Sequence, residues 1–128
     1  MTELTSCRPN LEVHDLEPTV THLTAILGFE LELLEPEMGL ALLHRDTVGL
    51  AVVRTTNPAV NETTACYIGV RGVDEFYRHC RSQGAIISVD LTDHPWGLRD
   101  FVVEIPGGHR LAFGERIAAT GADTGGID

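Results

Sequence analysis

The sequence contains an internal repeat that divides the 128 residues nearly in half. The segment LEVHDLEPTVTHLTAILGFELEL begins at residue 11, and YIGVRGVDEFYRHCRSQGAIISV begins at residue 67. Aligning Val13 with Val70, an offset of 70 − 13 = 57, brings His22 onto His79 and puts Gly28 one residue from Gly84. Such self-similarity indicates two copies of one structural unit.

The first copy opens with a short alternating strand at residues 11–13 and continues into a helix. Asp15 is expected to cap this helix by accepting a hydrogen bond from a first-turn amide. Pro18 is tolerated only in a first turn, so the helix should begin close to Asp15. Gly28 is expected to end it in a left-handed conformation. Three alternating strands follow at residues 29–35, 39–45 and 48–54, the last two joined by a turn at Asp46 and Thr47.

The second copy repeats this order after a linker at residues 55–64. A strand at 65–70 precedes a helix at 73–82, and strands follow at 85–91, 99–105 and 109–115. The sequence therefore predicts an α+β fold of two tandem βαβββ modules, about residues 8–54 and 64–116, in one domain of residues 1–118. We expect a curved, cup-like mixed sheet with helices on its outer face and a ligand site on the concave face. Residues 119–128 are expected to form a flexible tail.

The charge of the chain limits its partners. A net charge of −10 disfavours nucleic-acid binding, which needs a basic surface. It favours a cationic ligand, although acidity can also serve solubility alone. No apolar run is long enough to span a membrane. Three cysteines without CxxC spacing favour free thiols, and we expect a cytoplasmic protein.

The two quoted modules, with VHDLEPTVTHLTAILGFELE in the first and PWGLRDFVVEIPGGHRLAFGE in the second, resemble the vicinal oxygen chelate superfamily of glyoxalases, extradiol dioxygenases and bleomycin-resistance proteins. The resemblance covers about residues 8–116. It implies a divalent metal held by His and Glu side chains at four positions, which here are Arg8, Val53, Ala65 and Ala112. None is a usual metal ligand, so we expect neither a metal nor another cofactor.

The bleomycin-resistance type is the most similar subgroup. The shared features are Pro9 and the phrase formed by Trp96, Gly97, Arg99, Asp100 and Phe101. The resemblance implies an acidic homodimer that sequesters a cationic glycopeptide. The chain departs from this type at Ile105, where an Asp usually precedes the Pro-Gly turn, and in its aromatic content of only 5%. Both departures put the particular drug in doubt.

Strand alternation starting from Arg8 and Ala112 selects the residues that would face the ligand. The predicted ligand-binding residues are Arg8, Asn10, Glu12, His44, Val53, Tyr67, Trp96, Arg110 and Ala112. Trp96 either stacks on a planar or cationic ligand or covers the open end of the core. Glu12 and Arg110 either contact the ligand or form a buried ion pair. His44 either touches the ligand or makes a surface hydrogen bond.

The sequence thus favours a metal-free protein that sequesters a small organic molecule, such as a cationic aromatic antibiotic or natural product, with no catalytic residue. One alternative is a glyoxalase-like lyase, isomerase or dioxygenase, with displaced metal ligands at Glu12, His44 and Glu104 or with Glu12 as a general base. Another is a regulatory domain whose cup is filled by side chains. His22 and His79 are expected on solvated helix faces, and His109 at a hairpin edge.

Overall fold

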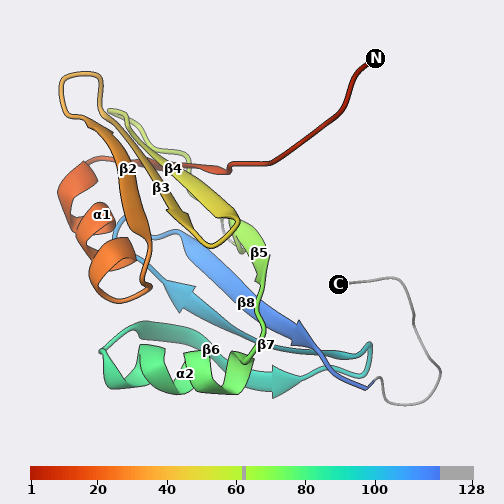
Figure 1. Ribbon diagram of the computed structural model, residues 1–128. Helices are drawn as coiled ribbons and strands as arrows, with labels where there is room; N and C mark the ends of the chain where they lie inside the picture. Colours follow the sequence, from red (N-terminus) through yellow and green to blue (C-terminus); the bar gives the residue numbers. More distant parts are fainter. Residues whose placement is uncertain (62, 119–128) are drawn as a thin grey trace. The chain divides into compact units, whose positions relative to one another are not determined.

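The computed structural model describes residues 1–61 and 63–118, and the tail predicted at 119–128 lies outside these residues. The chain divides into two compact units, Met1–Val60 and Asn61–Asp128. Each unit holds a four-stranded mixed sheet and one helix in the order βαβββ, as Figure 1 shows. The predicted α+β fold of two tandem βαβββ modules is therefore confirmed.

The first unit consists of β1 (Asn10–Val13), α1 (Leu16–Ala25), β2 (Glu30–Glu35), β3 (Leu40–Arg45) and β4 (Val48–Arg54). Its strands are ordered β1-β4-β3-β2, with β1 parallel to β4 and the other pairs antiparallel. The apolar side chains that alternate toward α1 form the core, and Leu11, Leu23, Leu43, Leu50 and Val52 are fully or almost fully buried. The other face of this sheet is not covered by α1.

The second unit repeats this plan with β5 (Cys66–Gly69), α2 (Val73–Ser82), β6 (Ile86–Asp93), β7 (Leu98–Glu104) and β8 (Arg110–Arg116). Its strand order is β5-β8-β7-β6, with β5 parallel to β8. Phe76 of α2 packs against Phe101 and Phe113 on the sheet. Leu111 and Phe113 therefore face the helix, whereas Ala112 between them points to the other face.

The ends of α1 confirm two predictions and correct one. Asp15 is the N-cap residue and Gly28 is left-handed with φ of 76°, as predicted. However, the Asp15 side chain makes no capping hydrogen bond. Pro18 is the third helical residue, so the amide to which an N-cap side chain most readily bonds is missing there.

The start of α2 is stabilised by a residue from the end of the module. Gly72 is the N-cap residue and offers no side chain. Instead, the Glu115 carboxylate on β8 accepts hydrogen bonds from the amides of Gly72 and Val73, at 3.2 and 3.0 Å. These bonds hold the pKa of Glu115 below its usual value. Strand β8 thus fixes the position of α2.

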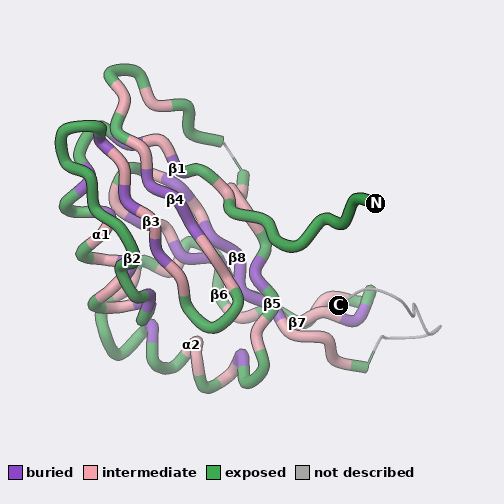
Figure 2. The backbone as a smooth tube through the Cα atoms, turned by 45° about the horizontal axis from the view of Figure 1, so that its top comes forward, coloured by how far each residue is buried: buried purple, intermediate pink, exposed green. Residues whose placement is uncertain are grey.

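The strands β2 and β6 lie at the edges of their sheets. All six residues of β2 are exposed, and Figure 2 shows this strand beside β3, which alternates between buried and partly buried residues. The exposed large apolar side chains on the two edges are Leu31, Leu33, Leu34, Ile86 and Val89. Both edges carry apolar side chains that are unusually exposed for a folded domain. No helix within the described part of the chain is long and apolar enough to cross a membrane.

Candidate functional site

Tyr67 lies across the uncovered face of the second sheet. Tyr67 pairs with Ala112, and the next pair on the same face of the sheet is Gly69 with Gly114. The Tyr67 hydroxyl occupies the place where a β-carbon at Gly114 would stand. Tyr67 is 47% exposed, so this glycine allows an aromatic side chain to reach over the last strand while remaining accessible.

Asp100 connects Tyr67 with the loop that carries the only tryptophan. The Tyr67 hydroxyl donates to Oδ2 of Asp100 at 2.9 Å, and Nε2 of His94 lies 2.7 Å from Oδ1. Both oxygens of this carboxylate, which is 14% exposed, are therefore held in place. Burial, followed by the bond to Asp100, raises the pKa of Tyr67, so the phenol stays protonated at neutral pH.

The indole of Trp96 stacks on the ring of His94. Its ring centroid is 4.4 Å from that of His94, with an angle of 11° between the planes. The indole is nevertheless 52% exposed. We call Tyr67, His94, Trp96 and Asp100 the Trp96 platform. It combines an accessible indole with a fixed carboxylate, the groups that bind planar and cationic molecules.

The loop that carries Trp96 is tightly fixed. The His94 amide donates to Leu98, and the Gly97 amide donates to His94. Gly97 has φ of 94°, which suits a glycine. Arg99 makes two hydrogen bonds to Asp93, at 2.6 and 3.0 Å. This guanidinium lowers the pKa of Asp93. The platform is therefore positioned before any ligand arrives.

Arg8 occupies a similar place on the uncovered face of the first sheet. Its guanidinium lies against Gly49, where an added β-carbon would be 3.1 Å from Cζ. Nη1 donates to the carbonyls of Leu43 and Leu50, at 3.0 and 3.2 Å. Nη2 donates to Glu32 at 3.2 Å. The side chain that replaces a metal ligand is thus held as part of a polar cluster.

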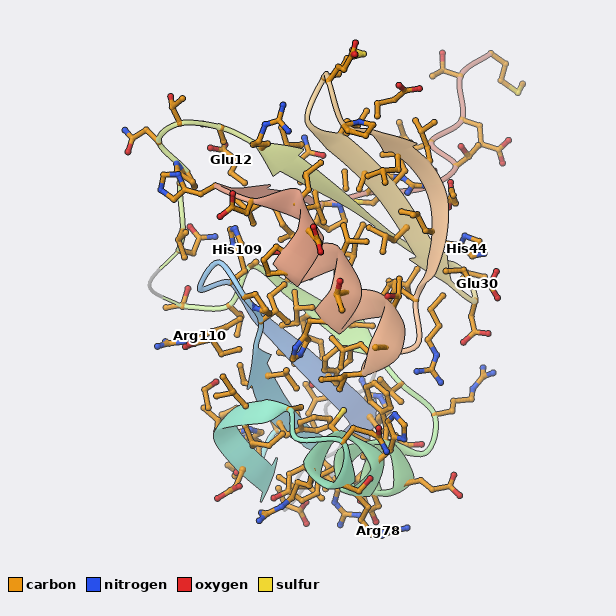
Figure 3. All side chains as sticks on the ribbon, turned by 90° about the vertical axis from the view of Figure 1, so that its left-hand side faces the viewer. Glu12, Glu30, His44, Arg78, His109 and Arg110 are labelled. Carbon is orange, nitrogen blue, oxygen red and sulfur yellow. The ribbon has the colours of Figure 1, made fainter. Side chains whose placement is uncertain are left out.

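His44 extends this cluster along the edge of the sheet. Its Nδ1 lies 2.9 Å from Oε1 of Glu32, close enough for an ion pair but without hydrogen-bond geometry. Its Nε2 lies 3.5 Å from Glu30, and Figure 3 shows these two side chains next to each other. His44 therefore lies between two carboxylates at the surface, and its contact with a ligand stays a prediction.

Glu12 and Arg110 each have a partner within their own unit. Oε1 of Glu12 accepts a hydrogen bond from the Ala59 amide at 3.1 Å. Nε of Arg110 lies 3.6 Å from Glu104, and both side chains are more than one third exposed. Figure 3 shows Arg110 projecting from its strand. A role of Glu12 as a base, or of either residue as a ligand contact, remains a prediction.

The remaining predicted residues lie on the expected sheet positions. Asn10 begins β1 and is exposed, Val53 pairs with Glu12, and Ala112 pairs with Tyr67 and is buried. Their contact with a ligand is untested. The side chains of Val53, Ala65 and Ala112 have no donor atoms, and Arg8 is cationic, so these four residues do not fit the metal that the resemblance implies.

A metal could also be held by donor side chains at other positions than these four. Within residues 1–61 and 63–118, no three His, Cys, Asp or Glu side chains are grouped so that they could hold a metal ion. The three cysteines are free thiols, as predicted. The described residues therefore provide no metal centre through which a reaction step could be derived.

One histidine prediction is wrong. His22 was expected to be solvated, but its Nε2 is buried without a hydrogen-bond partner, and burial lowers its pKa. His109 lies at the hairpin edge, as predicted, and is buried, with 4% exposure. The tight turn at Gly107 and Gly108 returns the chain so that His109 stands opposite Ile105. His79 is exposed, as predicted.

Sequence reasoning missed the residues that organise both uncovered faces. Glu32 stands at a β-bulge between Leu31 and Leu33, and bulges have no clear sequence signal. Asp100 was noted only as part of the phrase around Trp96 and not as a ligand-binding residue. Gly49 and Gly114 are glycines inside strands, which can mark a close approach of another group. These glycines could have indicated the close contacts of Arg8 with Gly49 and of Tyr67 with Gly114.

Two tandem βαβββ modules with polar and aromatic side chains on the faces opposite their helices define the vicinal oxygen chelate class of proteins. The model of the Glyoxalase/Bleomycin resistance protein/Dioxygenase superfamily matches residues 8–113. The chain belongs to this superfamily. Among proteins with curated functional descriptions, none matches the sequence.

Solved structures of the same fold include proteins with different activities. TioX from Micromonospora sp. ML1 is 27% identical over 88% of this chain and 99% of its own, with a TM-score of 0.74. TnmS3, an antibiotic binding protein from Streptomyces sp. CB03234, is 16% identical over 91% and 98%, with a TM-score of 0.76. Lactoylglutathione lyase from Agrobacterium tumefaciens is 17% identical over 90% and 96%, with a TM-score of 0.74. The last two likenesses concern the fold alone.

Proposed function

We propose that this protein binds and sequesters a small, planar, cationic organic molecule such as an antibiotic or other natural product, without a metal ion. The observation that carries this proposal is the Trp96 platform, in which the half-exposed Trp96 stacks on His94 and His94 in turn contacts the fixed carboxylate of Asp100. The presence of an antibiotic binding protein among structures of this fold is consistent with it.

The chemistry of the platform matches such a ligand. A planar ring gains contact area and offset stacking on the indole, and a positive charge gains attraction from its π face and from Asp100. Sequestration then lowers the free ligand concentration by mass action, with no bond made or broken. We propose that residues 1–118 form one binding domain. The other ligand contacts that we propose, on the uncovered face of each sheet, are Arg8, Asn10, Glu12, His44, Val53, Arg110 and Ala112.

We further propose a cytoplasmic homodimer. Free thiols at Cys7, Cys66 and Cys80 are usual in a reducing compartment. The exposed leucines of the edge strand β2 and the exposed Ile86 and Val89 of β6 offer apolar surface of the kind that subunit contacts cover.

The test is a titration of Trp96 emission with bleomycin-type compounds and other planar cationic natural products. Because Trp96 is the only tryptophan, a ligand that stacks on it should change the emission of the whole chain. Calorimetry should show that Trp96→Leu weakens the same binding by about fivefold or more, since stacking on an aromatic ring contributes ~1 kcal/mol or more. Met38→Leu, at an exposed position in the first unit, is the control. Absence of any response to these compounds would remove the main support.

A further inference from the structure

We propose that His94 sets the charge that the Trp96 platform accepts, so that a planar cation binds when His94 is neutral and is rejected when His94 is protonated. This inference rests on the proposed function, because it concerns binding at the same indole and carboxylate.

His94 contacts both binding groups of the platform at once. Its Nε2 lies 2.7 Å from Oδ1 of Asp100, and its ring is nearly parallel to the indole of Trp96, with centroids 4.4 Å apart. Neutral His94 donates through Nε2 to the carboxylate, and the lone pair then lies on Nδ1. A proton added to Nδ1 therefore places a positive charge beside the carboxylate and against the indole together.

The two effects of this proton act in the same direction. The combined charge of His94 and Asp100 changes from −1 to 0, so a cationic ligand loses its electrostatic partner. The indole also receives a cation on the side that His94 covers, which opposes a second cation at the same ring. Both changes alter the affinity for a neutral planar ligand much less than the affinity for a cation.

Several charged and titratable groups lie around His94. The groups that surround it are Asp100 on β7, Tyr67 on β5 through Asp100, Asp93 on β6, Arg99 on β7, and Arg116 at the β8 position paired with Leu98. The carboxylate of Asp93 is held by Arg99, and Tyr67 stays protonated. Histidine is the side-chain type whose charge usually changes between about pH 5 and 8, whereas arginine keeps its charge throughout that range.

The affinity of the platform for a cation should change with pH in one direction. Because the cation prefers the platform with neutral His94, its affinity should rise as the pH increases through the histidine range. By linkage, a ligand can shift an equilibrium only by its different affinities for the two states. Affinity for a neutral ligand of the same shape should therefore stay constant.

The experiment compares two tricyclic probes on the full chain, the permanent cation 10-methylacridinium and the neutral 10-methylacridone. Isothermal calorimetry is performed at several values from about pH 5.5 to about pH 8. The cation should bind about tenfold more tightly at the upper end, as expected for partly screened charges a few ångströms apart. The affinity of the neutral probe should not change.

Variants separate His94 from the other titrating groups. His94→Gln should remove the pH dependence of cation binding. His79→Gln is the matched control, because His79 is a second stacking histidine of the same unit, against Phe76, and should keep the wild-type dependence. Asp100→Asn provides a second test, since it should weaken cation binding at high pH much more than it changes binding of the neutral probe. Circular dichroism verifies that each variant is folded.

The outcomes distinguish this inference from the proposed function. If the cation binds the wild type equally at every pH, or if His94→Gln keeps the wild-type slope, the inference is overturned while binding at the platform stands. If neither probe binds at any pH, the proposed function is overturned, and this inference with it.

Discussion

The hydroxyl of Tyr67 fills the space that a β-carbon would occupy at Gly114. The two residues belong to the parallel strands β5 and β8, and the hydroxyl also donates to Asp100. A glycine in the last strand therefore determines the position of an aromatic side chain in the first strand of the same module.

Substituting Gly114 with alanine should displace Tyr67 and break its hydrogen bond to Asp100. We expect a loss of about 1 to 3 kcal/mol in the free energy of unfolding, as for overpacking at a filled site. Urea denaturation measures this loss. Gly69→Ala is the control, because its added β-carbon meets nothing within 4 Å. In a Tyr67→Ala background most of the cost should disappear. An equal cost in both backgrounds would show that Tyr67 is not the cause.

Substituting Glu115 with glutamine should weaken the start of α2. The carboxylate accepts amide hydrogen bonds that lower its pKa from 4.5, so its contribution is fully present above that value and is lost as the pH falls through the lowered pKa. We expect a lower Tm for Glu115→Gln at neutral pH and a smaller difference from the wild type in acid. Differential scanning calorimetry measures both. Glu37→Gln, at an exposed position outside the second unit, should change neither.

Elemental analysis tests whether displaced ligands form a metal site. After incubation with Zn²⁺, Mn²⁺, Fe²⁺ or Ni²⁺ and desalting, we expect clearly substoichiometric metal, because Arg8, Val53, Ala65 and Ala112 provide no donors. One tightly held ion per chain would contradict the proposed metal-free function. A loss of that ion in Glu12→Gln or His44→Gln would then identify its ligands and favour the enzyme alternative.

Sedimentation analysis tests the proposed homodimer. A dimer should sediment at twice the chain mass of 13.9 kDa. Leu34→Lys places a charge on the exposed edge strand β2 and should shift the protein toward the monomer, by about tenfold or more in dissociation constant if the leucine is covered in the dimer. Leu4→Lys, near the N-terminus, should leave the equilibrium unchanged. A wild type that stays monomeric at high concentration would contradict the proposal.

The sequence was sufficient to predict the local elements because each was encoded by several agreeing signals. Helix α2 matches its predicted bounds, since its apolar spacing, Gly72 and Gly84 all indicate the same segment. The turn at Asp46 was likewise predicted, and its φ is 52°. The predicted capping hydrogen bond of Asp15 is absent, because Pro18 at the third helical position has no N–H group to donate it.

The contacts at the candidate site could not be predicted in the same way. Arg8 meets Glu32 across 24 residues, and Tyr67 meets Asp100 across 33. These pairs depend on strand register and on a bulge in β2, which single-sequence patterns do not determine. Alternation did predict the face on which Glu12, Val53 and Ala112 stand, because it requires only the period of a strand.

The parallel pairs β1 with β4 and β5 with β8 join the first strand of each module to its last. During synthesis from the N-terminus, neither sheet can be completed until its final strand has left the ribosome. The first module contains all its strands once Arg54 has emerged, while the second module is still being made. The first module can therefore begin to fold before the last strands of the second module have emerged.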